Sequence, residues 1–90
     1  MLTESLLYKN GMSTLVDIPK SARHEDGFIF VEMESGRELS FSIAGNPHLE
    51  GQPHEKLDDI ELSPFGLHWP QLDEDLSVRG IEAGEYGQNE

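Results

Sequence analysis

The fold of this chain is decided by the stretch Gly66-Leu67-His68-Trp69-Pro70-Gln71-Leu72-Asp73-Glu74-Asp75-Leu76-Ser77-Val78, which holds its only tryptophan. Proline cannot donate a hydrogen bond to a sheet, so Pro70 marks the end of a strand or its edge. Leu67, Trp69 and Leu72 are placed to face a core, whereas the three carboxylates that follow are expected to meet water. The order of residue types therefore predicts a strand, a corner and the start of a final short helix.

The final helix is predicted to begin at a capping side chain, either Asp75 or Ser77, since both types accept hydrogen bonds from helical N–H groups. Gly84 is its expected end, because glycine adopts the left-handed conformation that closes many helices. Residues 85–90 are predicted to be a mobile tail. The apolar side of the helix consists of Leu76, Val78 and Ile81.

A β-hairpin is predicted over residues 28–43, because apolar side chains alternate with others on both arms. Ser35-Gly36 supplies the turn, where a positive φ is needed. Phe28 and Phe30 lie on the opposite face, so both sides of this sheet are expected to be partly covered. The inward residues are Ile29, Val31, Met33, Leu39, Phe41 and Ile43.

Two further segments are predicted before the hairpin. Residues 1–12 are an N-terminal extension or a short helix, and Met12 is an alternative start of the protein. Residues 14–18 are a short β-branched run that Pro19 is expected to stop.

After the hairpin, Pro53 suits the first turn of a short helix that runs to about residue 59. Leu57 and Ile60 are its expected inward residues. From Ile60 the chain is predicted to form a strand through Leu62 and to turn back into the strand that ends at Trp69.

Together these elements predict a small two-layer α+β domain over residues 13–84, with an antiparallel sheet of about four strands packed by short helices. A chain of 90 residues buries about 60 to 65% of its unfolded surface, so it holds one modest core. Because only 36% of the residues are hydrophobic, we expect the fold to gain stability from a partner or from homo-oligomerisation.

Several classes of protein are excluded by composition. The chain has no cysteine, which excludes disulfides and thiolate zinc sites. No apolar run approaches the ~20 residues of a membrane span, and the N-terminus lacks the features of a signal peptide. We therefore expect a cytoplasmic protein without membrane contact.

The net charge of the chain indicates which kind of partner it attracts. Eighteen acidic residues against six basic ones give a net charge of -12, and residues 47–90 hold 11 of the acids against Lys56 and Arg79. Such a surface repels nucleic-acid phosphates and attracts a basic protein partner. The alternative is that the charge serves solubility alone.

No arrangement of residues assembles a reaction, so the sequence predicts neither an enzyme nor a cofactor. Alternating polar residues from Asp73 resemble the opening of a calcium loop, but Val78 and Gly84 stand where that loop needs glycine and glutamate. The four histidines lack the spacing of a zinc site, although His48 and His54 lie in one loop region. Nucleophile-elbow and phosphate-loop patterns do not occur.

The segment from Gly66 to Gly84 resembles the C-terminal signature of a bacterial family of small proteins, the domain of unknown function 2442. In one branch the pattern is G-[LI]-H-W-P-x-[LI]-D-E-D-[LI]-S-V-x-G, after a strand pair with an acidic-Gly-Arg turn. Here that turn is Ser35-Gly36-Arg37, with Ser where Asp is usual. Family members often carry W-[FY]-P-R-L where this chain has Gly45-Asn46-Pro47-His48-Leu49. The resemblance covers approximately residues 20–84.

The resemblance implies a function exerted through partners. Members are often encoded beside another small domain in an arrangement like a toxin-antitoxin pair, which implies an acidic protein-binding module that neutralises a basic neighbour. Some relatives carry a helix-turn-helix segment after this domain, which implies the alternative of an accessory domain of a DNA-associated regulator acting through a partner. A purely structural homo-oligomer is the third alternative.

The residues predicted to bind a partner are the acidic corner together with Arg79 and His48. The corner has a structural alternative, in which it caps the final helix and orders the chain after Pro70. His48 lies in the loop that departs from the family pattern. The predicted set is His48, Asp73, Glu74, Asp75 and Arg79.

Overall fold

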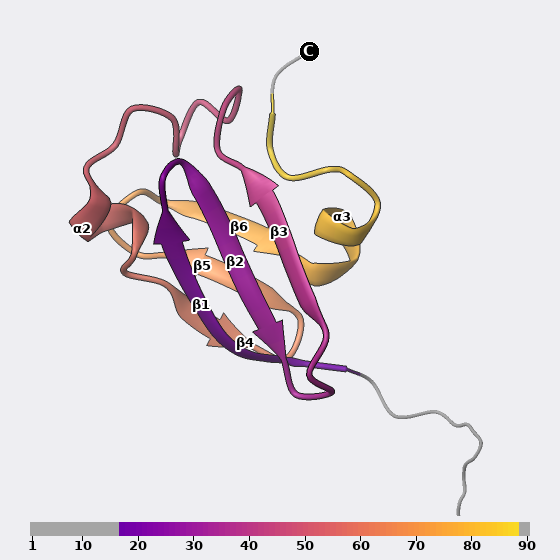
Figure 1. Cartoon of the computed structure of the whole chain (residues 1–90). Helices are drawn as coiled ribbons and strands as arrows, with labels where there is room; N and C mark the ends of the chain where they lie inside the picture. Colours follow the sequence, from indigo (N-terminus) through magenta and orange to yellow (C-terminus); the bar gives the residue numbers. More distant parts are fainter. Residues whose placement is uncertain (1–16, 89–90) are drawn as a thin grey trace, which may run out of the picture.

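The computed structural model describes residues 17–88, which form a small domain of six strands and two short helices (Figure 1). In chain order the elements are β1 (Pro19–Glu25), β2 (Phe28–Met33), β3 (Glu38–Ser42), α2 (His54–Leu57), β4 (Glu61–Ser63), β5 (Gly66–Trp69), β6 (Glu74–Ser77) and α3 (Val78–Glu82). The strands form two antiparallel sheets, ordered β1-β2-β3 and β4-β5-β6. The predicted α+β class is confirmed, but the strands lie in two three-stranded sheets instead of one sheet of about four.

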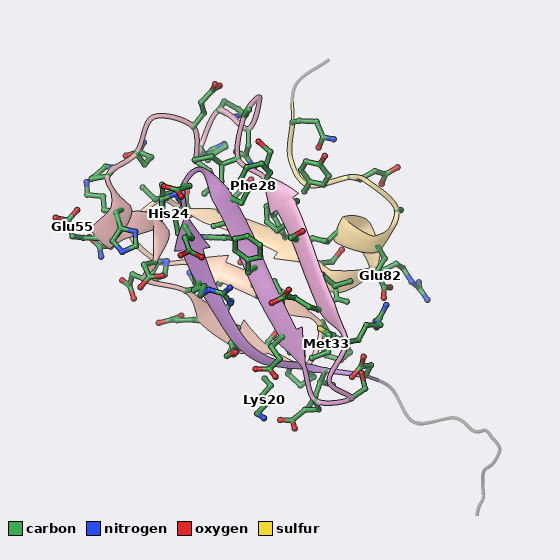
Figure 2. All side chains as sticks on the ribbon, viewed as in Figure 1. Lys20, His24, Phe28, Met33, Glu55 and Glu82 are labelled. Atoms are coloured by element: carbon green, nitrogen blue, oxygen red, sulfur yellow. The ribbon has the colours of Figure 1, made fainter. Side chains whose placement is uncertain are left out.

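The predicted hairpin is β2 and β3. Its register pairs Ile29 with Phe41 and Val31 with Leu39, so the inward residues share one face. Gly36 occupies the turn with a φ of 93°, which glycine adopts without steric cost. Phe28, on the other face, is 45% exposed (Figure 2).

Strand β1 corrects the prediction for the segment around Pro19. Pro19 begins a strand instead of stopping one, because the first residue of an edge strand needs no N–H donor. The strand has no apolar alternation, since an edge strand leaves most of its side chains in water. The predictions for residues 1–12, and residues 14–16 of the run 14–18, lie outside the described residues.

The second sheet begins as predicted, with β4 turning back into β5. A turn then follows in which the N–H of Leu72 donates to the carbonyl of Trp69 at 3.1 Å, with Pro70 in the position that its fixed φ favours. Asp73 takes a left-handed conformation with a φ of 54°, which Asp tolerates better than most residues. The chain therefore reverses within four residues, which the sequence did not indicate.

Strand β6 corrects the predicted corner. Residues 74–77 pair with β5 instead of starting a helix, and Trp69 lies opposite Glu74. Ser77 is the helix cap, since its Oγ accepts from the N–H of Gly80 at 2.9 Å, and Asp75 is not the cap. Gly84, with a φ of 83°, follows the helix as predicted.

The core lies between the two sheets, with β1-β2-β3 in front of β4-β5-β6 in Figure 1. Trp69 is fully buried at its centre, and its indole Nε1 donates to the carbonyl of Leu57 at 2.8 Å. This bond fastens α2 to β5, so the tryptophan connects two segments of the chain. The buried apolar residues are Ile29, Val31, Met33, Phe41, Ile43, Leu49, Leu57, Leu67, Trp69, Leu76, Val78 and Ile81.

The chain after α3 packs against the domain as far as it is described. Tyr86 lies against Phe41, with the ring centroids 5.1 Å apart, and its carbonyl accepts from Asn46 Nδ2 at 3.0 Å. Tyr86, which makes these contacts, lies within residues 85–90, the segment predicted to be a mobile tail, and residues 89–90 lie outside the described part of the chain. No helix within residues 17–88 is long and apolar enough to cross a membrane.

Candidate protein-binding site

The three carboxylates of the predicted acidic corner have three different surroundings. Asp73 is exposed in the left-handed position of the β5–β6 turn. Glu74 is half-buried, and its Oε2 accepts from Asn46 Nδ2 at 2.8 Å. Asp75 is exposed on β6, where its Oδ1 lies 2.6 Å from His68 Nδ1 on the neighbouring strand. Consecutive strand residues point to opposite faces, so Glu74 faces inward while Asp75 faces water.

Asn46 explains why Glu74 is held inside. Asn46 is fully buried, and a buried amide needs partners for both ends. Its Nδ2 donates to Glu74 and to the Tyr86 carbonyl, while its Oδ1 accepts from the N–H groups of His48 at 2.8 Å and Leu49 at 3.3 Å. His48 is thus connected to Glu74 through Asn46, with its own side chain exposed. Glu74 and the His48 backbone belong to the scaffold.

The fold brings together two acidic runs that are separate in the sequence. Gln71 Nε2 donates to Asp59 Oδ2 at 2.9 Å, which places the end of α2 beside the β5–β6 turn. Glu61 on β4 lies opposite His68, which in turn lies opposite Asp75. We call the resulting surface the acidic end, and its members, all exposed, are Glu55, Asp58, Asp59, Glu61, Asp73 and Asp75.

The acidic end has little compensating charge. Lys56 is the single Lys or Arg between residues 53 and 76, and Arg23 of β1 lines a shallow pocket together with Asp58. Asp58 accepts from the backbone N–H of His24 at 2.9 Å, and Figure 2 shows Glu55 projecting outward from α2. Because each exposed pair interacts weakly across water, the effect of this surface comes from the summed field of its carboxylates.

His54, at the start of α2, contacts His24 and not His48, which lies in the same loop region of the sequence. His54 Nδ1 lies 2.9 Å from His24 Nδ1, and His24 Nε2 accepts from the N–H of Gly27 at 3.1 Å. In the neutral imidazole, this acceptor role of Nε2 leaves the proton on Nδ1, the nitrogen that faces His54. A metal at His24 Nδ1 would require a proton on Nε2, opposite to this arrangement. Within residues 17–88, no three His, Asp or Glu side chains are grouped to hold a metal.

Arg79 lies at the other end of the second sheet. It lines a groove of about 570 Å³ between the β2–β3 turn, the β4–β5 turn and α3. We call it the Phe65 groove, after the aromatic residue of the β4–β5 turn that lines it. The structure therefore separates Arg79 from Asp73 by the length of β5, whereas Asp75, opposite His68, lies between them.

A second arginine organises one wall of this groove. Arg37 Nε lies 3.2 Å from Asp17 Oδ2, and Arg37 Nη2 lies 2.5 Å from Glu82 Oε2. Hydrogen bonds from the side chain and backbone of Ser35, together with Arg37, lower the pKa of Asp17 from its usual value. The hydrogen bonds to Glu82 and Asp17 raise the pKa of Arg37. The predicted Ser35-Gly36-Arg37 turn thus supplies a wall of the groove.

The fold defines a small α+β domain with two three-stranded sheets, and residues 19–87 match the family described as Protein of unknown function (DUF2442). The chain belongs to this family. A protein of unknown function from Rhodospirillum rubrum, known from a crystal structure, is 31% identical with a TM-score of 0.71, covering 81% of this chain and 93% of that one. An uncharacterised Chromobacterium violaceum protein, solved by NMR, is 28% identical with a TM-score of 0.69, covering 79% and 69%. Comparison with curated proteins found no match.

The residues that the sequence did not predict are Glu55, Asp58, Asp59 and Glu61 in the acidic end and Phe65 in the groove. Adjacent acids at Asp58-Asp59 were visible in the sequence as a charged run. Their position beside the β5–β6 turn depends on the Asp59–Gln71 hydrogen bond, which is a tertiary contact without a sequence signal.

Proposed function

We propose that this domain is a protein-binding module that recognises a basic protein partner through the acidic end. The observation that carries the proposal is the convergence of six exposed carboxylates from α2, β4, the β5–β6 turn and β6, which outnumber the neighbouring cations Lys56 and Arg23. Their field accelerates the encounter with a positively charged partner, and the acceleration weakens as salt screens it. It equally opposes direct contact with nucleic acid.

The scaffold supports a preformed surface. Trp69 ties α2 to β5 and Gln71 ties Asp59 to the β5–β6 turn, so the carboxylates stand on connected elements. A surface that is already ordered loses less conformational entropy on binding than a flexible one. Within this function, an antitoxin-like role that silences a basic partner is the finer form of the proposal, supported by the acidity of the chain.

The proposal is tested by capture of partners with three tagged proteins in a cell extract. The first is the wild type, and the second carries Glu55→Gln, Glu61→Gln and Asp73→Asn. These three side chains form no side-chain hydrogen bond within residues 17–88, and Asn tolerates the left-handed backbone of Asp73. The second protein should therefore fold normally while it loses charge from the acidic end.

The third protein is a matched control with the same net charge as the second. It carries Glu32→Gln, Glu34→Gln and Glu85→Gln, which are exposed and lie on β2, the β2–β3 turn and the segment after α3. We expect the wild type and the control to retain a basic protein that the acidic-end variant loses. Equal retention by all three proteins would contradict the proposal.

A further inference from the structure

Phe65 is more exposed than any other large hydrophobic residue in the described part of the chain. Its exposed fraction is 77%, compared with 45% for Phe28 and 39% for Leu62. A single exposed apolar residue is common on protein surfaces and needs no explanation by itself. Phe65 differs because its backbone is fixed and because it borders a groove.

The backbone of Phe65 is held on both sides. Its N–H donates to Ser63 Oγ at 3.3 Å, and its carbonyl accepts from the N–H of Val78 at 2.9 Å. Ser63 Oγ also accepts from the N–H of Gly66 at 3.2 Å. The turn is therefore ordered by polar contacts, while the phenyl ring contributes little to the core. An exposed aromatic side chain on a fixed backbone suits an interface anchor, because the backbone loses little entropy when it binds.

The Phe65 groove differs from the acidic end in its charge. Pro64, Phe65 and Val78 give it apolar walls. Its acidic members, Asp17 and Glu82, are matched by Arg37 and Arg79. Removing water from a balanced set of charges costs less than removing it from uncompensated carboxylates. Interface centres are likewise poor in acids and rich in aromatic residues and arginine.

We infer that the Phe65 groove is the dry centre of the partner interface, where an apolar side chain of the basic partner packs against Phe65 with Lys or Arg on either side. This inference rests on the proposed function and names the chemistry of the partner segment. The apolar side chain matches Pro64, Phe65 and Val78, and its basic neighbours match the surrounding acidic surface.

One interface can cover both the groove and the acidic end. The groove adjoins the Gly66 end of β5, and the acidic end adjoins the Trp69 end of the same strand. Four strand residues span about 13 Å. A standard interface covers about 800 Å² on each partner, which is wide enough to reach both regions.

Three synthetic peptides test the inference by NMR titration of the ¹⁵N-labelled full chain. The first has two central leucines flanked by lysines, the second has serines in place of the leucines, and the third has glutamates in place of the lysines. We expect the leucine–lysine peptide to bind about ten-fold more tightly than the serine–lysine peptide. Its largest amide shifts should fall on Phe65, Val78 and Arg79, and the glutamate peptide should not bind.

Two variants of the domain complete the test. Phe65→Ser should remove the preference for leucine, whereas Phe28→Ser, which changes an exposed phenylalanine on the other sheet, should preserve it. Both folds are checked by their amide spectra. If both lysine peptides bind equally, or if the preference survives in Phe65→Ser, the groove is not the interface centre while the proposed function stands. If neither lysine peptide binds, both proposals fail.

Discussion

The two ends of the β4-β5-β6 sheet carry opposite kinds of surface. At the Trp69 end, the six carboxylates of the acidic end are exposed to water, with Lys56 among them and Arg23 of β1 beside Asp58. At the Gly66 end, the Phe65 groove combines apolar walls with two arginines and two matched acids. In the interface that we propose, the difference separates two tasks, since a charged surface governs the rate of encounter and a neutral apolar one governs how long the complex lasts.

The largest effect is expected at the residue that holds the acidic end together. Trp69→Ala removes a fully buried side chain and its hydrogen bond to Leu57. We expect a loss of about 3 to 5 kcal/mol in the free energy of unfolding, which is most of the stability of a small domain. Urea unfolding followed by circular dichroism measures it, and a melting temperature within a few degrees of the wild type would refute the structural role. Trp69→Phe, which keeps most of the volume, should lose less.

A smaller loss of stability is expected on substitution of Asn46, whose hydrogen bond holds Glu74 inside while Asp73 and Asp75 remain exposed. Asn46→Ala leaves the Glu74 carboxylate, the Tyr86 carbonyl and the His48 N–H without their side-chain partner, whereas the Leu49 N–H keeps its bond to the backbone carbonyl of residue 46. A buried polar group that loses its partner costs about 1 to 3 kcal/mol. Because Glu74 is half-buried and His48 is exposed, water can replace part of what they lose, so we expect the total loss to stay within that range. The control is Glu74→Gln, whose side-chain oxygen still accepts from Asn46, and it should unfold at nearly the wild-type urea concentration. Comparable losses from both variants would show that the charge of Glu74, and not the network, stabilises the loop.

The smallest effect concerns the wall of the Phe65 groove and depends on pH. The pKa of Asp17 is lowered in the folded state by Ser35 and Arg37, so the ionised form favours folding. Its contribution to stability is present above the ordinary value of 3.8 and is lost as the pH falls through the lower folded pKa. Asp17→Asn should therefore differ from the wild type near pH 6 and converge with it in strong acid. A difference in unfolding free energy that persists unchanged in strong acid would disagree with this account.

The elements that the sequence predicted are those whose signal is local. The β2–β3 hairpin follows from alternation and Gly36, the helix cap from Ser77, and the buried position of Trp69 from its apolar neighbours. Strand β1 was not predicted because most of its residues are polar. It lies at the edge of its sheet, where most of its side chains can remain in water. Strand β6 was missed because its acids suggested a helix start.

Part of the candidate site was predictable because its acidic residues are also a local signal in the sequence. Charge indicated an acidic surface, and Asp73 and Asp75 belong to it. The inward orientation of the Glu74 side chain depends on Asn46, which is far away in the sequence. The separation of Arg79 from Asp73 depends on the path of β5. Long-range contacts of this kind leave no periodic pattern in a single sequence.

The most direct test of the central claim is the rate at which a captured basic partner associates with the domain over a salt series from about 50 to 300 mM, a range in which screening changes strongly. The account predicts that Glu55→Gln, Glu61→Gln and Asp73→Asn together slow association several-fold at low salt and flatten its salt dependence, with a near-normal dissociation rate. The variant with Glu32→Gln, Glu34→Gln and Glu85→Gln should stay closer to the wild type. An equal slowing in both variants would assign the effect to net charge alone, and unchanged rates in both would contradict a recognition role for the acidic end.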